Sequence, residues 1–277
     1  ADRDNQSYRG NINYNGDRYG MQAERLVVGR GFVPEVGFVR RPDMHKSSAT
    51  LRFSPRPKRI RRVRKFGYTG TWSRIANGTG RRETENWEGE FAVELQNTDT
   101  FEGALGGAYE FLPRPFTIAP RVVVPVGGYD TGYVRGGYNF GRQRPLSGNV
   151  TAQHGTFYSG HLTTLGVSGA RVNVSNQISI EPSLSINWVD LLQGSFSTRL
   201  IGSRVTYTMT PQMFTSALVQ YNSTSHIVSA NVRLRWEYRP GSEFFIVYND
   251  QRDTLTPGFP DTANRALVVK INRLLSF

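Results

Sequence analysis

The amino-acid sequence predicts an all-β protein of antiparallel strands, and three observations support that fold class. Apolar and polar residues alternate along residues 85–96, 178–188 and 226–238, which is typical of strands with two different faces. Residues that favour tight turns separate the alternating segments. The last segment, residues 266–277, also alternates and ends on an aromatic residue.

The C-terminal segment indicates which kind of β protein this is. Counted by twos, one of its faces carries Val269, Ile271, Leu275 and the terminal Phe277. A final strand of this kind is typical of bacterial outer-membrane barrels, in which lipid-facing residues are apolar. We interpret these four residues as a barrel-assembly signal. A soluble β protein whose last strand happens to end on phenylalanine is the alternative.

The composition permits a transmembrane β-barrel. The 277 residues have a mean hydropathy of −0.45 and contain no apolar run near the roughly 20 residues that a membrane-spanning helix needs. Every second residue of a barrel strand faces the lumen, so a polar average is expected. The 29 glycines, 13 tyrosines and 16 phenylalanines suit tight turns and aromatic girdles. The absence of cysteine excludes disulfides and thiolate metal sites.

The net charge of +12 would suggest a nucleic-acid partner if the protein were soluble. The densest basic run, residues 58–65, starts just after a turn at residues 54–57. A basic strand start fits better near anionic lipid head groups or along a lumen. No nucleic-acid partner is therefore predicted.

The connections between strands fall into two classes by length. Three are long, at residues 29–46, 113–130 and 250–264. Outer-membrane barrels have short periplasmic turns and longer outer loops, so the long connections are expected outside the cell. The short turns lie at residues 15–18, 54–57, 97–100, 142–145, 175–177, 210–212 and 239–242.

The strand count bears on whether the barrel is complete. We count roughly fifteen strands, and bacterial barrels use an even number. Either the segment near residues 6–14 is not a membrane strand and about 14 remain in a single domain of residues 1–277, or upstream strands of a larger barrel are missing. We favour the second reading.

Alternation assigns side chains to two faces. Charged residues on the lumenal face would set a transverse field that selects solutes, or they would form a salt-bridge network that fills the interior. Long loops that fold inward would favour the network. The lumen-lining candidates are Lys65, Glu88, Glu90, Glu94, Glu181, Arg233, Arg235 and Glu237, and the lipid-facing aromatic candidates are Trp72, Trp87, Trp188, Trp236 and Tyr238.

The long loops contain apolar residues, which indicates that they pack on something, since solvated loops would not need them. These residues are Phe32, Val33, Val36, Phe38, Ile118 and Val122, Val123 and Val124.

Residues with catalytic or metal-binding chemistry form no recognisable motif. The four histidines lack metal-ligand spacing. His154 with Ser159 is the nearest candidate for nucleophilic catalysis, and we interpret this histidine as a rim residue beside a turn. Glycines at residues 103–107 lie inside a strand, where they permit close backbone packing. We predict no catalytic residue, no metal site and no cofactor.

Five segments resemble an uncharacterised family of bacterial envelope proteins. They are FVPEVGFVRR at 32–41, FTIAP at 116–120, PVGGYD at 125–130, LVQYNS at 218–223 and LRWEYRPGS at 234–242. Longer members of that family join an N-terminal carbohydrate-binding-like module of the family nine type to a C-terminal membrane-associated β domain of unknown function. The resemblance implies that this chain corresponds to the C-terminal part, and it supplies no activity and no catalytic residue.

Together these observations predict a bacterial outer-membrane β-barrel that is not an enzyme. It would act as a pore or conduit, or as the membrane part of a carbohydrate-handling surface protein. The alternative is a structural or assembly component that anchors a partner through its outer loops, and a membrane hydrolase is the third hypothesis. The expected partners are outer-membrane lipid and lipopolysaccharide, the barrel-assembly machinery, and another envelope protein or a carbohydrate.

Overall fold

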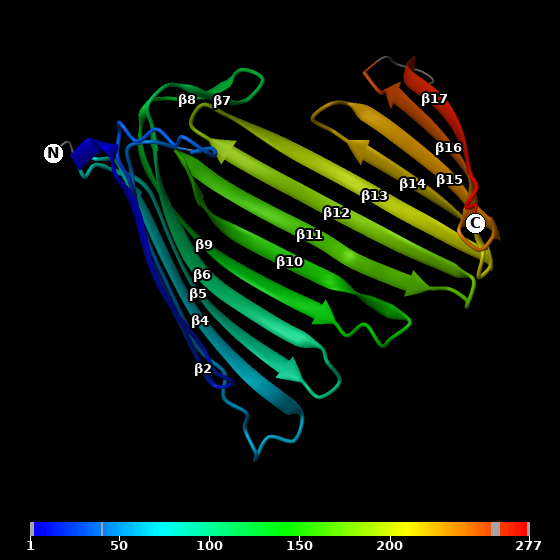
Figure 1. Cartoon of the computed structure of the whole chain (residues 1–277), viewed down its shortest axis with the longest axis horizontal. Coiled ribbons are helices and arrows are strands. Elements are labelled where there is room, and N and C mark those ends of the chain that lie inside the picture. The colour runs from blue at the N-terminus through cyan, green and yellow to red at the C-terminus, as the bar shows by residue number, and fades with distance from the viewer. Residues whose placement is uncertain (1–2, 40, 256–260, 276–277) are drawn as a thin grey trace. The chain divides into compact units, whose positions relative to one another are not determined.

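The computed structural model of the chain describes residues 3–39, 41–255 and 261–275. Its main element is an antiparallel sheet of fifteen strands (Figure 1). Each strand of this sheet pairs with the next sheet strand along the chain, so β6 pairs with β9 and the strands between them lie outside the sheet. The only helix in the described residues is a single 3-10 turn, η1 (Arg3–Asn5). The fold is therefore all-β and antiparallel, as predicted. The order runs from β1 at one edge to β17 at the other, and the described strands form no closed barrel.

The strands are long for a globular protein and follow one another with short connections. In chain order the sheet contains β1 (Ser7–Asn15), β2 (Tyr19–Val28), β3 (Met44–Phe53), β4 (Val63–Ala76), β5 (Arg82–Leu95), β6 (Thr100–Leu112), β9 (Gly127–Phe140), β10 (Leu146–Phe157), β11 (Gly160–Asn173), β12 (Ile178–Leu191), β13 (Gly194–Thr210), β14 (Met213–Asn222), β15 (Ile227–Arg239), β16 (Ser242–Asp253) and β17 (Asp261–Asn272).

The chain divides into two compact units, which are described separately below. Unit 1 consists of residues 1–138, 152–163 and 189–196. Unit 2 consists of residues 139–151, 164–188 and 197–277.

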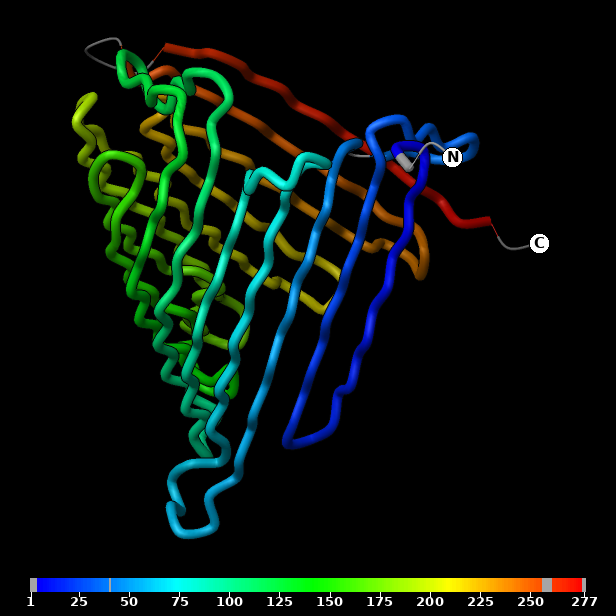
Figure 2. Tube along the Cα trace, turned by 90° about the vertical axis from the view of Figure 1, so that its left-hand side faces the viewer, coloured from blue at the N-terminus to red at the C-terminus, as the bar shows by residue number. Residues whose placement is uncertain are grey.

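The seven predicted short turns all fall between consecutive sheet strands, and they occupy every second connection. The sequence reasoning was correct here because Gly, Pro, Asn and Asp disfavour continued extended structure. The three long connections are shorter than predicted, at residues 29–43, 113–126 and 254–260. The third is shorter than the connection at residues 54–62, which contains a predicted short turn, so the predicted division by length is wrong for these two connections. In unit 1, residues 29–43 and 113–126 both lie at the upper end of the strands in Figure 2.

The two terminal segments have different outcomes. All nine residues of β1 pair with β2, so the count of roughly fifteen strands is confirmed, and the reading in which the first segment is not a strand and about 14 remain is wrong. The last strand begins at Asp261 and ends at Asn272, whereas residues 266–277 were predicted. Asn272 pairs with Glu243 near the start of the antiparallel strand β16, so β17 ends level with the first residues of its partner strand. Phe277 lies outside the described residues.

The core of unit 1 forms around a hairpin inside the connection at residues 113–126. The hairpin pairs β7 (Phe116–Ala119) with β8 (Val122–Val124). Val122 and Val124 are buried in a cluster with Leu112, Val189 and Leu191. The predicted packing of Ile118, Val122 and Val124 is thus confirmed, because this loop folds onto the sheet. Val123 points the other way and is exposed.

Glycines in β6 permit a close approach of neighbouring side chains, as predicted. A Cβ at Gly107 would lie 2.8 Å from the Thr131 carbonyl oxygen and 2.7 Å from Trp87 Nε1, which is closer than packed atoms tolerate. Gly106 and Gly107 therefore serve packing, whereas a Cβ at Gly103 would meet no atom within 4 Å, so the prediction is wrong at that residue.

Candidate membrane-facing surface and charged face

One face of unit 1 presents large apolar side chains that remain exposed, and we call it the apolar face. Met21, Leu51 and Leu105 lie on it, together with Trp72 and Trp87. Cross-strand pairing of Met21 with Leu51, and of Trp72 with Trp87, puts these residues on a common face. The predicted outward positions of Trp72 and Trp87 agree with this arrangement.

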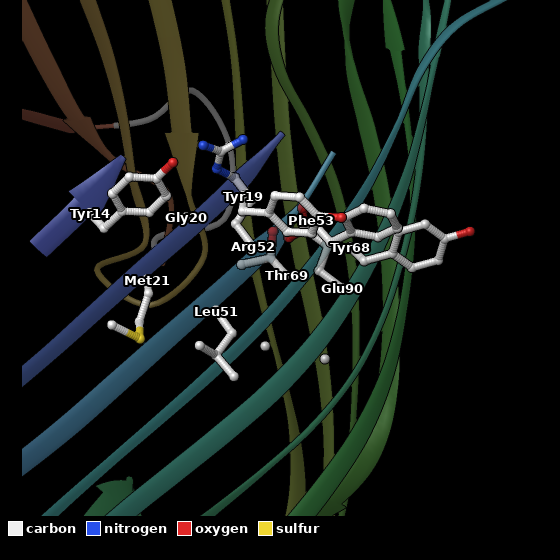
Figure 3. A pocket seen from close by; sticks show the side chains of 12 residues that line it. Tyr14, Tyr19, Gly20, Met21, Leu51, Arg52, Phe53, Tyr68, Thr69 and Glu90 are labelled. Atoms are coloured by element: carbon white, nitrogen blue, oxygen red, sulfur yellow. The ribbon is translucent and has the colours of Figure 1, made fainter. Parts of the chain in front are cut away.

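A row of stacked rings crosses the apolar face from β2 to β5, and we call it the aromatic row. Tyr19 stacks on Phe53 with ring centroids 5.2 Å apart, Phe53 on Tyr68 at 6.0 Å, and Tyr68 packs on Phe91 at 5.0 Å. The Arg18 guanidinium lies over the Tyr19 and Phe53 rings. Figure 3 shows the rings of Tyr19, Phe53 and Tyr68 in line.

A shallow pocket of about 630 Å³ lies beside the aromatic row (Figure 3). Tyr14, Met21 and Leu51 contribute to its lining, and the paired residues Gly70 and Gly89 leave it open because neither has a side chain. The lining is predominantly apolar, which suits a hydrocarbon chain better than a polar ligand.

A second aromatic group lies at the far end of β6. The Arg82 guanidinium is 3.5 Å from the Tyr109 ring centroid, and the Arg81 guanidinium is 4.7 Å from the Phe111 ring centroid. Phe101 and Phe111 have the same parity on β6 and are separated by about 33 Å along the strand. For a strand tilted by roughly 40°, this separation corresponds to about 25 Å of depth, the height of the apolar band of an outer-membrane barrel.

Unit 2 repeats the apolar face on its last three strands. Val232 pairs with Tyr248, which pairs with Leu267. Leu234 pairs with Ile246, which pairs with Val269. Trp236, Phe244 and Ile271 form the next row. Trp188, Trp236, Val269, Ile271 and Leu275 are exposed, whereas Tyr238 is half-buried and donates a hydrogen bond to the Asn272 carbonyl.

The opposite face of unit 1 carries paired charges, and we call it the charged face. Arg135 of β9 lies 3.0 Å from Glu88 Oε2 and 3.6 Å from Glu90 Oε2. The Tyr133 hydroxyl donates a hydrogen bond of 2.5 Å to Glu88. Two of the predicted inward glutamates therefore share one arginine, as expected of a salt-bridge network.

Lys65 and Glu94 also meet on the charged face, as their predicted common side requires. Lys65 Nζ lies 3.3 Å from Glu94 Oε2, and Arg64 Nη1 lies 2.9 Å from Glu94 Oε1. The register shifts between Val63 and Lys65. Such a bulge lets consecutive residues reach the same side of the sheet.

Three of the predicted inward charges of unit 2, Arg233, Arg235 and Glu237, are hydrogen-bonded or packed on a ring, whereas Glu181 has only a longer contact with an arginine. Arg235 donates from Nε to Glu243 at 2.8 Å, and Arg233 lies over the Phe245 ring. Glu237 accepts a hydrogen bond from the Gly241 backbone. Glu181 lies 3.8 Å from Arg204 Nε.

Sequence reasoning missed Arg64, Tyr133 and Arg135. Tyr133 and Arg135 lie on β9, whose glycines weaken the contrast between its two faces. Tyr129, Tyr133 and Arg135 are separated by even numbers of residues, so they lie on one side of β9. This spacing was the signal that could have identified a polar side. Nothing in the sequence marks the bulge that brings Arg64 to Glu94.

The long connection at residues 29–43 differs from its prediction. Val33, Val36 and Phe38 are 76%, 96% and 85% exposed, although their apolar character was taken to indicate packing. Phe32 alone is half-buried. The described residues of this loop form no internal hairpin like β7–β8, so nothing turns Val33, Val36 and Phe38 toward the sheet and they form an exposed apolar tip.

The candidate catalytic pair is not assembled. His154 Nδ1 lies 2.8 Å from the Thr163 hydroxyl, and its ring stacks on His161. The Ser159 hydroxyl instead donates to Gln193 Oε1 and accepts from the Leu192 backbone. Among the described residues no cluster of three or more acidic or histidine side chains could hold a metal ion. No helix in that part of the chain is long and apolar enough to cross a bilayer.

One exposed ion pair joins two turns outside the strands. Arg56 donates from Nη2 to Asp17 Oδ1 at 2.8 Å. This hydrogen bond lowers the pKa of Asp17 below its usual value, and the neighbouring positive charges act in the same direction.

Comparison with protein-family models, with curated proteins and with solved structures finds no match to this chain.

Proposed function

We propose that this chain spans the bacterial outer membrane as part of a β-barrel and that its charged face lines a passage for solutes. One observation supports the proposal most. The same long strands carry exposed apolar side chains bounded by arginine-capped rings on one face and paired charges on the other. Lipid on one side and water on the other would satisfy both faces.

Water is a poor environment for the apolar face. Soluble monomers rarely expose a contiguous apolar patch larger than a few hundred Å². Leu51, Leu105 and Trp87 are each more than half exposed, and they belong to a face that crosses several strands. Acyl chains would cover this face, while the rings and arginines at its ends would lie at the level of the head groups.

A membrane location also requires that the edges of the sheet be paired. Backbone N–H and C=O groups of an open edge find no partner in hydrocarbon. Closure of β1 and β17, with each other or with further strands, is therefore part of the proposal. Closed barrels that resist detergent migrate faster on a gel before heating than after heating, and this chain is expected to do so. Recovery of the folded chain from the aqueous fraction without detergent would contradict the proposal.

The hairpin β7–β8 narrows the proposed passage at one end. The buried valines of the hairpin pack against Leu112 of β6. Leu112 lies on the same side of the sheet as Glu88, because Glu88 pairs with Gly106 and alternate residues of β6 share a side. The purified protein in planar bilayers should give conductance steps, and removal of residues 115–125 should enlarge them. If the protein inserts into the bilayer but gives no conductance steps above background, the proposed membrane location is retained and the proposed passage is rejected.

A second function is favoured by the exposed tip of residues 29–43. Val36 and Phe38 are almost fully exposed, and such residues are common in contacts with other proteins. An anchoring role predicts that Phe38→Ser releases a partner that co-purifies after mild detergent extraction. Leu192→Ser, at an equally exposed turn residue, is the matched control. If the chain is extracted in mild detergent without any co-purifying protein, this result would count against an anchoring role.

The idea of a carbohydrate-handling surface protein depends only on the resemblance described above. A membrane hydrolase has no supporting geometry, since His154 and Ser159 engage different partners. Null results on lipid, peptide and glycan substrates are expected.

A further inference from the structure

The face of unit 2 that carries Glu181 and Arg204 contains a polar pocket of about 590 Å³, and the proposed function does not use it. Arg142, Arg171 and Arg204 line it, from the connection after β9, from β11 and from β13. Glu181 is the one carboxylate in the lining. The pocket therefore has more positive than negative charge.

The arginines of this pocket are poorly satisfied by the protein itself. Arg204 Nε lies 3.8 Å from Glu181 Oε2, which is too long for a hydrogen bond. Arg171 donates from Nε to Asn173 Oδ1 at 3.0 Å, and an amide oxygen does not neutralise its charge. The Arg142 side chain has no ion pair or hydrogen bond among the described residues.

The network of unit 1 shows what a structural set of charges looks like in this chain. There Arg135 lies between two glutamates, and Lys65 and Arg64 share a third. The pocket of unit 2 instead concentrates guanidinium groups without matching carboxylates. Guanidinium groups bind carboxylate and phosphate through two parallel hydrogen bonds, so an anion is the ligand that would complete the site.

The backbone is irregular where the pocket forms. Gly169 has a φ of +57° inside β11, and Gly148 has a φ of +144° inside β10. A Cβ at Gly148 would lie 2.6 Å from the Ala170 Cα. Irregularities of this kind change the direction of nearby side chains and are frequent next to functional sites. Gly169 and Ala170 both line the pocket.

Uncharged hydrogen-bonding groups complete the lining. Ser147, Ser183, Asn173 and Gln220 contribute hydroxyl and amide groups. Such groups bind the hydroxyls of a ligand and fix its orientation, while the charged groups supply most of the attraction.

We infer that this pocket binds a small hydroxylated organic anion, a sugar acid or a sugar phosphate, by its carboxylate or phosphate group. The arginines hold the anionic group, and the serine and amide side chains hold the hydroxyls. This inference names the solute class of the passage and in that respect rests on the proposed function. Binding is measurable apart from conduction, so the two can fail separately.

The test is calorimetric titration of the purified full chain in detergent micelles with glucuronate, glucose 6-phosphate and neutral glucose. Both anions should bind at least tenfold more tightly than glucose, and binding should weaken as salt is raised. Preference for one anion identifies carboxylate or phosphate as the bound group. Equal affinity for glucose and the anions, or no binding of either anion, would overturn the inference.

Variants separate this site from general charge attraction. Arg142→Gln should weaken anion binding about tenfold, because it removes one charged donor. Arg199→Gln, on the exposed surface of β13 and outside the pocket, should leave binding unchanged. Glu181→Gln should strengthen binding, since it removes the single repulsive carboxylate, and a variant that merely misfolds could not do so.

Weaker binding by Glu181→Gln, or equal losses from Arg142→Gln and Arg199→Gln, would contradict the site. Conductance without binding would reject the pocket alone, and binding without conductance would reject the passage alone.

Discussion

Replacement of Leu105 by arginine gives the most direct test of the proposal that the apolar face meets lipid. Leu105 is 58% exposed on the apolar face of β6, between the rings of Phe101 and Phe111 that mark the two ends of the apolar band. An arginine near the bilayer midplane costs about 2 to 4 kcal/mol. That cost lowers the folding equilibrium constant by about 30- to 700-fold.

The control lies on the other face of a nearby strand. Thr71 of β4 is exposed and pairs with Glu88 on β5, so Thr71→Arg places a cation beside a carboxylate in water. Its effect should be within about 0.5 kcal/mol. Urea titrations of folding into phospholipid vesicles, monitored by tryptophan fluorescence, measure both variants. Equal damage from the two variants, or no damage from Leu105→Arg, would refute the assignment of faces.

Three further predictions concern packing, the charge network and pH. Val124 of the hairpin is fully buried against the sheet, so Val124→Ala should cost about 1.5 kcal/mol, whereas Val126→Ala, at a 52% exposed residue, should change the free energy of unfolding little. Arg135→Met leaves two half-buried glutamates, Glu88 and Glu90, without their arginine and should cost about 1 kcal/mol. The cost of Arg135→Met should be smaller in a variant that already lacks one of these glutamate charges. Because its folded-state pKa is lowered, Asp17 with Arg56 stabilises the fold above the unfolded-state pKa and loses that contribution as pH falls through the folded-state pKa. Asp17→Asn should remove this part of the pH dependence in denaturation curves recorded across acidic pH, and an unchanged curve would contradict it.

Much of the strand arrangement could be read locally. The alternation at residues 226–238 predicts the row of Val232, Leu234 and Trp236 that pairs with β16, because side chains of a strand point to opposite faces with a period of two. The turns were found for the same reason, since glycine and proline act through their own backbone.

Contacts between distant residues were not readable in this way. Two apolar loops looked alike in sequence, yet Val124 lies on a hairpin that packs on the sheet and is fully buried, while Val36 is 96% exposed. Arg135 reaches Glu88 only because β6 and β9 are neighbours in the sheet. The skipped residues between them form the hairpin, and no local pattern announces that β6 pairs with β9.

The sequence by itself determined that the strands have one apolar and one polar face and where most of them end, because these properties arise within a few consecutive residues. The tertiary structure decided which charges are paired, as at Arg135, and which remain open to a ligand, as at Arg142. It also decided which loop packs on the sheet. The physical reason is that register, bulges and the proximity of opposite charges depend on partners that lie far apart in the chain.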